Sequence, residues 1–280
     1  MDTNQDPLLC GWIIFVQREI AVKTYRGYLL DLDGTIYRGN EVIPEAVTFI
    51  RELRKANIPF LFLTNNSSAT PEHVAQRLTD MGIETAAEEV YTSSMGAAAY
   101  LQERYPAGTD VFAIGEAGLH KALAEIGCRQ VSDGANVVIT GIDREFSYEK
   151  LAMAATAIRN GALFLATNRD PALPTERGLM PGNGSLVAAI ATASDVEPIV
   201  IGKPERVLVD YALERLGTKR EETLIVGDNL LTDIGAGANS GIDSLLVFTG
   251  YSREEDLATS KWQPTHLAQD LMDWWRKCQA

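Results

Sequence analysis

The sequence predicts an α/β protein built on a doubly wound, Rossmann-like parallel sheet, arranged as two domains or as one large domain with an insertion. Short apolar runs alternate along the chain with amphipathic segments, which is the pattern of repeated strand–helix units. The apolar runs are continuous rather than alternating, so helices are expected to cover both faces of the sheet. The length of 280 residues exceeds the ~100–200 residues of a typical domain.

The first third of the chain contains two predicted strand–helix units. A strand is expected at 28–33, and apolar residues at helical spacing predict a helix at 44–56. The run 58–64, IPFLFLT, is apolar throughout and predicts a second strand. The helix predicted at 70–81 carries Pro71 in its first turn, a position that tolerates proline.

The middle third repeats this pattern and then changes composition. The segment 168–185, NRDPALPTERGLMPGNGS, is rich in Gly, Pro and Asn, and it predicts a long loop. A connection of this length usually carries function or marks a seam between domains. The preceding strands are expected at 110–115, 136–141 and 162–167, and the helices at 116–126 and 148–160.

The last third returns to strongly apolar strands and ends in an amphipathic segment. Trp274 and Trp275 in that segment are expected to close the core. The strands are expected at 198–202, 223–227 and 244–250, and the helices at 206–216, 232–240 and 267–277.

The composition excludes several classes of partner. A formal charge of −13 repels nucleic acid phosphates, so no nucleic acid partner is expected. A phosphate-bearing substrate would need a metal ion or a lysine to reverse this field locally. No apolar run is long enough to span a bilayer, so no membrane partner is expected. Cys10, Cys128 and Cys278 are far apart and form no CxxC pair, which favours a reducing cytoplasm.

Residues 1–21 precede the first predicted strand without completing a strand–helix unit. Asp2 and Asp6 lie before the apolar run 8–16, which is atypical of a signal peptide. We interpret these residues as an N-terminal extension, and we hypothesise that the biological start lies near Val22.

The strongest chemical signal is the sequence Asp31-Leu32-Asp33-Gly34-Thr35. Residues two apart on a strand point to the same side, so the two carboxylates project together where the first strand ends. Carboxylates on an apolar strand are costly to bury unless a cation accompanies them. A turn capped by the aspartates is the structural alternative.

Three further polar clusters follow predicted strands. They are Thr64-Asn65-Asn66-Ser67-Ser68, Gly202-Lys203-Pro204, and Gly227-Asp228-Asn229 with Asp233 beyond it. Each has a structural alternative, namely a helix cap, a surface lysine and a turn. If all the strands belong to one parallel sheet, their carboxyl ends share one edge, and the clusters are expected to converge there.

Together these clusters favour phosphoryl transfer assisted by Mg²⁺. Carboxylate oxygens of Asp31 and Asp228, with the backbone carbonyl of Asp33, are ligands that a hard cation prefers. Lys203 is a point charge that can hold both a phosphate and a carboxylate nucleophile. The Thr64 hydroxyl and the Asn65 N–H can bind the phosphoryl oxygens.

The motifs DLDGT, LTNN, GKP and GDNLLTD, in this order, resemble the four motifs of the haloacid dehalogenase superfamily of aspartyl-phosphate phosphatases. The sequences TNN, TNRD, PGNGS and GDN also resemble its NagD-like branch, whose members carry a large α/β cap. The resemblance implies a core domain at 22–91 and 184–280 with a cap domain inserted at 92–183. It also implies a cytoplasmic Mg²⁺-dependent phosphatase of small phosphorylated metabolites: sugar phosphates, sugar acid phosphates or nucleoside monophosphates.

The resemblance further implies roles for individual residues. Asp31 matches the nucleophile, and Asp33 matches the general acid and base. Thr64 and Lys203 match the remaining catalytic positions. The matching substrate-binding residues are Asp33, Thr64, Asn65, Asn66, Lys203 and Asn229, the metal ligands are Asp31, Asp33 and Asp228, and Asp233 supports the waters of the metal.

Substrate choice is expected to depend on the cap. Asn168, Arg169 and Asp170 are the candidates, and Arg169 is suited to the carboxylate of a sugar acid phosphate. The alternative is that Arg169 is solvated or pairs with Asp170. A homodimer through the cap is a further expectation. The three histidines, His73, His120 and His266, are interpreted as structural.

Three other functions remain open at the level of sequence. A phospho-aspartate receiver domain uses similar residues, but it needs only ~120 residues, and Asp33 would promote loss of its phosphoryl group. A phosphomutase would return isomerised product with little free phosphate. A non-catalytic binding module has no need of four converging polar clusters.

Overall fold

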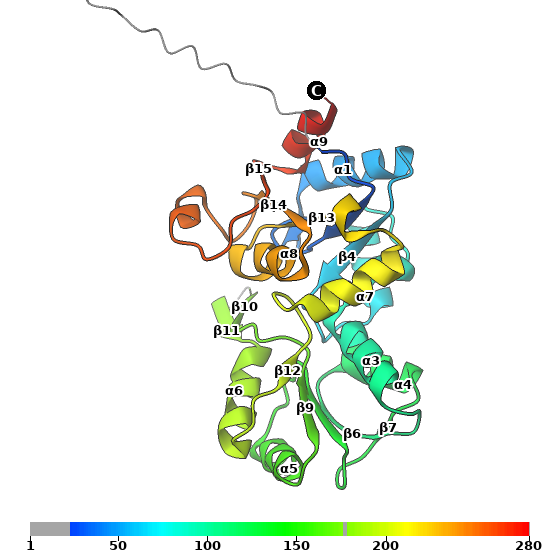
Figure 1. Cartoon of the computed structure of the whole chain (residues 1–280), viewed down its shortest axis with the longest axis vertical. Helices are drawn as coiled ribbons and strands as arrows, with labels where there is room; N and C mark the ends of the chain where they lie inside the picture. Colours follow the sequence, from blue (N-terminus) through cyan, green and yellow to red (C-terminus); the bar gives the residue numbers. More distant parts are fainter. Residues whose placement is uncertain (1–22, 176–177, 280) are drawn as a thin grey trace, which may run out of the picture.

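The computed structural model describes residues 23–175 and 178–279, which form two α/β units (Figure 1). The predicted extension at 1–21 and Cys10 lie outside the described residues. None of the described helices is long and apolar enough to cross a membrane.

The first unit is a parallel sheet with the Rossmann strand order. Counted along the chain, its strands lie in the order 3-2-1-4-5-6, and the order reverses between β1 and β13. Ligands of such sheets bind at the carboxyl ends of the two strands at this reversal. From one edge to the other, the sheet runs β5 (Val90–Thr92), β4 (Phe60–Thr64), β1 (Gly27–Leu30), β13 (Thr223–Gly227), β14 (Asp243–Val247) and β15 (His266–Ala268).

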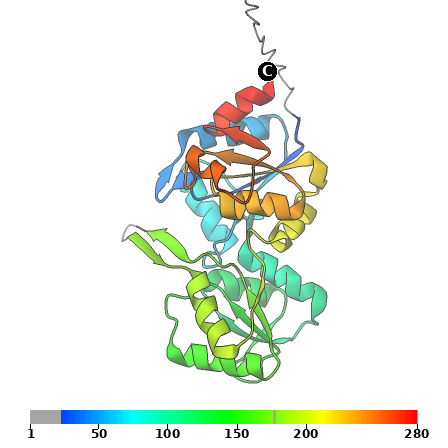
Figure 2. The same ribbon diagram turned by 60° about the vertical axis from the view of Figure 1, so that its left-hand side comes forward.

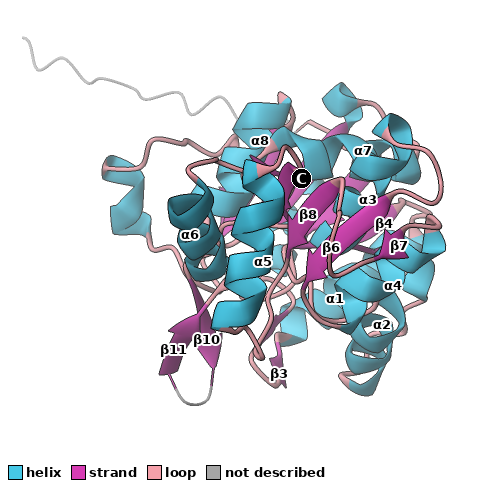
Figure 3. Ribbon diagram, turned by 90° about the horizontal axis from the view of Figure 1, so that it is seen from below, coloured by secondary structure: helices cyan, strands magenta, loops and turns pink. Residues whose placement is uncertain are grey.

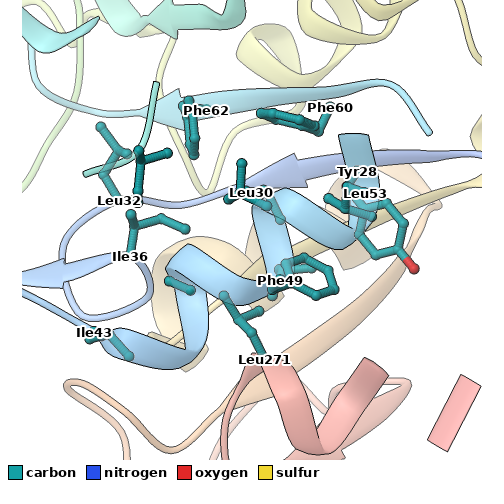
Figure 4. Packing of buried hydrophobic residues seen from close by; sticks show 14 of the residues in the cluster. Tyr28, Leu30, Leu32, Ile36, Ile43, Phe49, Leu53, Phe60, Phe62 and Leu271 are labelled. Carbon is teal, nitrogen blue, oxygen red and sulfur yellow. The ribbon is translucent and has the colours of Figure 1, made fainter. Parts of the chain in front are cut away.

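Helices cover both faces of this sheet, as its apolar strands predict. Tyr28 and Leu30 of β1 face one helical layer, whereas Leu29 between them faces the other. Figure 4 shows the first layer, where Phe49 and Leu271 pack under β1 and β4. The first layer contains α1 (Pro44–Lys55), α2 (Pro71–Asp80) and α9 (Leu271–Gln279), and the second contains α7 (Arg206–Leu216) and α8 (Gly235–Ser240).

The second unit is another parallel sheet between two pairs of helices (Figure 3). Its strand order is β12 (Ile199–Val200), β9 (Leu163–Ala166), β8 (Val137–Thr140), β6 (Asp110–Ile114) and β7 (Arg129–Gln130). One face packs on α3 (Ser93–Arg104) and α4 (Ala117–Glu125), and the other packs on α5 (Tyr148–Arg159) and α6 (Asn183–Ser194).

Two hairpins and several single-turn helices complete the described chain. The hairpin of β10 (Ala172–Thr175) and β11 (Gly178–Pro181) projects from the second unit (Figure 2). The remaining elements are the hairpin of β2 (Tyr37–Arg38) and β3 (Glu41–Val42), the short helices η1 (Ala87–Glu89), η2 (Arg220–Glu222) and η4 (Glu254–Ala258), and the π-helical turn η3 (Leu230–Ile234).

The structure corrects three sequence-based predictions. The segment 168–185 is not mostly loop. Its Gly and Pro content suggested irregular structure, but an antiparallel hairpin pairs the backbone hydrogen-bonding groups of its two strands. The strand predicted at 198–202 pairs with β9, so the second unit extends beyond the expected boundary at 184. The helix predicted from 267 begins at Leu271, because 266–268 adds the edge strand β15.

The two closing tryptophans lie where the sequence predicts them. Trp274 is 1% exposed, and Trp275 packs edge-to-face on Phe49, with ring centroids 5.9 Å apart. Burying these rings supplies much apolar contact area for so short a helix.

The carboxyl edges of the two sheets face each other. The loop after β4 carries this contact: Ser67 Oγ accepts a hydrogen bond from the Ile142 N–H (3.0 Å), and the Ser68 carbonyl accepts one from the Gly118 N–H (2.8 Å). A Cβ on Gly118 would lie 2.4 Å from the Ala69 oxygen, so the backbones approach as closely as only glycine permits. Residues that follow strands of either sheet therefore meet at one junction.

Candidate active site

Polar residues from both sheets meet at this junction. Asp31 and Asp228 follow β1 and β13, the two strands at the reversal, and Thr64 ends β4. Lys203 follows β12, which belongs to the second sheet. The expectation that all four clusters share one sheet is therefore wrong, but they converge because the two carboxyl edges are opposed.

The Lys203 ammonium group lies between two carboxylates. Its Nζ is 2.5 Å from Asp31 Oδ1 and 2.6 Å from Asp233 Oδ1, and it donates to the Leu63 carbonyl at 3.3 Å. The side chain is 3% exposed, so the lysine is not a solvated surface residue. Burial alone lowers the pKa of Lys203, but the carboxylates of Asp233 and Asp31 outweigh it and raise the pKa, which keeps the amine protonated.

Three carboxylates gather beside this amine. Asp31, Asp228 and Asp233 each offer an oxygen, and these oxygens lie within 4.8 Å of one another. Three carboxylates against one ammonium leave two excess negative charges when all are ionised. A hard divalent cation would offset this excess, and carboxylate oxygens are its preferred ligands. The residues present therefore fit Mg²⁺.

Two glycines make room for Asp228. A Cβ on Gly34, whose φ is +87°, would lie 2.2 Å from Asp228 Oδ2, and one on Gly250 would lie 2.0 Å from the same atom. The Tyr251 N–H donates a hydrogen bond to that oxygen. Gly250 and Tyr251 lie outside the four sequence motifs, although their place just after an apolar strand could have indicated them.

Burial dominates the protonation of the acidic cluster. It raises the pKa of Asp31 well above its ordinary value, with Lys203 opposing the shift. Burial, followed by the nearby charge of Asp233, raises the pKa of Asp228 to about 7. A bound cation would act in the opposite direction, because it favours the ionised carboxylates.

Asp33 lies apart from the carboxylate cluster. It is exposed, whereas Asp31 is only 12% exposed. Desolvation raises the pKa of Asp33, while the charge of Arg77 and a backbone hydrogen bond from Gly39 oppose this effect. The side chain is therefore free of the ion pairs that engage Asp31.

The second motif holds the lysine in place. The Asn65 side chain accepts a hydrogen bond from the Lys203 N–H (2.8 Å) and donates one to the Lys203 carbonyl (3.0 Å). These bonds engage the Asn65 amide, so only its backbone N–H is left for the predicted contact with substrate. Thr64 is buried, and its Oγ1 accepts a hydrogen bond from the Asn66 N–H at 3.1 Å.

Asn66 and Asn229 have local structural partners. Asn66 Oδ1 accepts hydrogen bonds from the Ser68 N–H (2.9 Å) and hydroxyl (2.9 Å), which caps the turn. Asn229 Oδ1 accepts one from the Leu231 N–H (2.9 Å), and the Asn229 N–H donates to Asp233 Oδ2 (3.1 Å). Asp233 therefore links Asn229 directly to Lys203.

The predicted specificity residues divide into two groups. Asn168 donates to the Asn65 carbonyl at 2.8 Å, and Asp170 accepts from Asn65 Nδ2 at 3.2 Å, so both face the junction. Arg169 is exposed and pairs with Glu197 rather than with Asp170. Asn183 is not among the predicted site residues, but it donates to the Asn168 carbonyl at 2.8 Å; its place in the PGNGS sequence was the available signal.

The three histidines have partners other than the carboxylate cluster. The His73 backbone N–H donates to Oγ1 of Thr70, which caps the N-terminus of α2. The His120 ring contacts Gln130 Oε1 at 2.7 Å. The His266 ring contacts the Tyr25 hydroxyl at 2.7 Å, at the start of β15.

Comparisons with known proteins identify the family. A model of haloacid dehalogenase-like hydrolases matches residues 28–129, and a HAD-hydrolase-like model matches 200–274. The 5'-nucleotidase YutF of Bacillus subtilis is 47% identical over 253 residues, which cover 90% of this chain and 98% of that protein. The chain belongs to the haloacid dehalogenase-like hydrolase family. The resemblance that the four motifs indicate is thus confirmed.

Other members of the family are also similar along most of their length. An acid sugar phosphatase of Staphylococcus aureus is 43% identical over 251 residues, covering 89% of this chain and 96% of that protein. A mutant thermostable NPPase of Geobacillus stearothermophilus superposes with a TM-score of 0.85 at 48% identity, covering 90% and 99% of the two chains. A glycerol phosphate phosphatase of Mycobacterium tuberculosis, in complex with magnesium, superposes with a TM-score of 0.84 at 38% identity, covering 89% and 76%.

Proposed function

We propose that this protein is a Mg²⁺-dependent phosphatase that hydrolyses small phosphomonoesters through a phospho-aspartate at Asp31. The observation that carries the proposal is the buried contact of Lys203 with Asp31 and Asp233, beside Asp228, where the sheet order reverses. The similar proteins named as phosphatases and as a nucleotidase support the same reaction.

The reaction proceeds in two displacements at phosphorus. An Asp31 carboxylate oxygen attacks the phosphorus, and the ester oxygen leaves with a proton from Asp33. Asp33, now ionised, takes a proton from a water molecule, and this water attacks the phospho-aspartate. The P–O bond to Asp31 breaks, so inorganic phosphate forms and the Asp31 carboxylate is restored.

The other residues of the junction bind and orient the phosphoryl group. The Lys203 ammonium holds Asp31 in place and offers its charge to the phosphate oxygens. The Thr64 hydroxyl and Asn65 N–H face the same edge and are suited to the remaining oxygens. Asn66 and Asn229 contribute less, because the structure gives their side-chain oxygens local partners.

Mg²⁺ would be held by the Asp31 and Asp228 carboxylates and the Asp33 carbonyl, with Asp233 supporting its water ligands. When bound, it offsets the repulsion between the phosphate dianion and the carboxylate nucleophile. Substrate choice would depend on Asn168 and Asp170, because they face the junction, whereas Arg169 is engaged by Glu197. The cytoplasmic location and the homodimer through the cap stay predictions.

The decisive experiment is phosphate release from a panel of sugar phosphates, sugar acid phosphates and nucleoside monophosphates with Mg²⁺. We expect repeated turnover, and we expect Asp31→Asn to abolish it, because an amide cannot form the phospho-enzyme. A single phosphorylation without turnover would indicate a receiver domain, and an isomerised ester without free phosphate would indicate a mutase. Full activity of Asp31→Asn would contradict the assigned nucleophile.

A further inference from the structure

The β2–β3 hairpin begins immediately after the turn that carries Asp33. The Gly34 N–H donates to the Tyr37 carbonyl at 2.7 Å, and Asp33 bridges to Tyr37. Gly39 has a φ of +54°, which permits the two-residue turn between the strands. A backbone hydrogen bond from Gly39 in that turn also opposes the rise in the pKa of Asp33 that burial causes. The place of the Asp33 carboxylate therefore depends on the place of the hairpin.

The hairpin is too short to hold its position alone. Its ladder consists of two residue pairs, Tyr37 with Val42 and Arg38 with Glu41. An isolated two-stranded hairpin is only marginally stable in water, so contacts from outside must fix it. On one side Thr249 provides them: its hydroxyl donates to the Gly34 carbonyl at 2.7 Å, and its carbonyl accepts from Arg38.

Arg77 of α2 provides further contacts to this hairpin. Its Nη2 donates to the Gly39 carbonyl at 2.5 Å, and its guanidinium lies over the Tyr37 ring, 4.4 Å from the centroid. Arg77 thus contacts both Gly39, in the turn of this hairpin, and Tyr37, the residue that bridges to Asp33. Arg77 is only partly buried and lies outside the four motifs. Its importance for the hairpin is therefore visible from its contacts and not from its position in the sequence.

We propose that Arg77 is a positioning residue for Asp33: by fixing Gly39 and Tyr37, it places the carboxyl group that protonates the leaving oxygen. The inference rests on the role of Asp33 in the proposed function. Displacing a reacting group by about 1 Å can cost on the order of 100-fold in rate. The loss of rate should appear only with substrates whose leaving oxygen must receive a proton.

The test compares two leaving groups. An alkyl phosphate such as glycerol phosphate needs a proton on its departing oxygen, whereas the nitrophenolate of p-nitrophenyl phosphate departs without one. The value of kcat/KM reports the steps up to the first irreversible one, so it isolates departure of this group. We expect Arg77→Met to lower kcat/KM for glycerol phosphate about tenfold or more, and that for p-nitrophenyl phosphate less than about threefold.

Three variants make the comparison sharp. Arg77→Lys keeps the charge and one donor, so it should restore part of the loss. Asp33→Asn should show the same leaving-group dependence with a larger loss. Arg51→Met, the same substitution at an exposed position of α1, should leave kcat/KM unchanged for both substrates.

Two results would overturn the inference in distinguishable ways. Equal losses on both substrates in Arg77→Met, with a leaving-group-dependent loss in Asp33→Asn, would make Arg77 merely structural and leave the role of Asp33 intact. If Asp33→Asn itself showed no leaving-group dependence, the assignment of Asp33 as proton donor would fail, and the inference about Arg77 would fail with it.

Discussion

Lys203 is the single residue on which the charge balance of the junction most depends. Its ammonium group is buried between Asp31 and Asp233, and its backbone is held by the side chain of Asn65. A buried ion pair contributes little net stability when intact, but removing one partner leaves the other charge uncompensated. The three carboxylates would then share the site with no cation from the protein.

We predict that Lys203→Met lowers the free energy of unfolding by about 3–5 kcal/mol and abolishes phosphate release. Urea unfolding measures the first effect, and a phosphate assay the second. Lys55→Met is the matched control, because Lys55 pairs with Glu52 on the surface at 70% exposure, and its loss should change stability by no more than about 0.5 kcal/mol. A Lys203→Met variant as stable as the wild type would refute the prediction.

At the scale of elements, the turn after β1 combines an unusual backbone conformation with close packing. Gly34 adopts a φ of +87°, and no space is left beside it for a side chain, because Asp228 lies there. Gly82, at the end of α2, has the same φ of +87° but has nothing within 4 Å of the position of a Cβ. Substituting these two glycines therefore distinguishes the effect of backbone strain, which both share, from the effect of contact with Asp228, which only Gly34 has.

We predict that Gly82→Ala costs about 1–2 kcal/mol of stability, from left-handed backbone strain, and leaves activity unchanged. Gly34→Ala should carry the same strain and also displace Asp228, so that phosphate release falls and the Mg²⁺ concentration for half-maximal activity rises. Chemical unfolding and Mg²⁺ titration of the rate distinguish the two. Equal Mg²⁺ dependence in both variants would show that the turn does not shape the acidic site.

The helices α3 and α6 were not predicted from the sequence, because neither carries a stripe of large apolar residues. The helix α3, SSMGAAAYLQER, presents small residues to its neighbours: a Cβ on Gly96 would lie 2.7 Å from Leu208 Cδ1 of α7. Close helix packing needs such residues, but they give no amphipathic signal. The helix α6, NGSLVAAIATAS, is also rich in small residues, and it lies partly inside the predicted loop.

At the scale of the whole molecule, the acidic cluster lies at the junction of two units in a chain whose formal charge is −13. Asp31, Asp228 and Asp233 come from the first unit, and the amine that faces them follows a strand of the second. A cation bound there would offset the repulsion among the carboxylates. Its binding free energy would add to the stability of the native state.

We predict that Mg²⁺ raises the melting temperature, by an amount that grows with its concentration. At 100 times its Kd, the added stability is about 2.7 kcal/mol. Thermal unfolding with Mg²⁺ and with EDTA measures the shift, and Asp228→Asn should reduce it strongly, because one ligand becomes neutral. An equal shift in Asp228→Asn would indicate general screening of the negative surface instead of a site.

Local patterns in the sequence predict the apolar runs that become strands and the polar residues at their carboxyl ends. Asp31, Asp228 and Thr64 are placed by these short-range patterns, because each lies next to a strand that is readable from its own residues. The family follows from the same motifs. Which sheet each strand joins, and therefore how Lys203 reaches Asp31 across the junction, follows only from long-range packing. That arrangement depends on hydrogen bonds between residues far apart in the chain, which no local periodicity encodes.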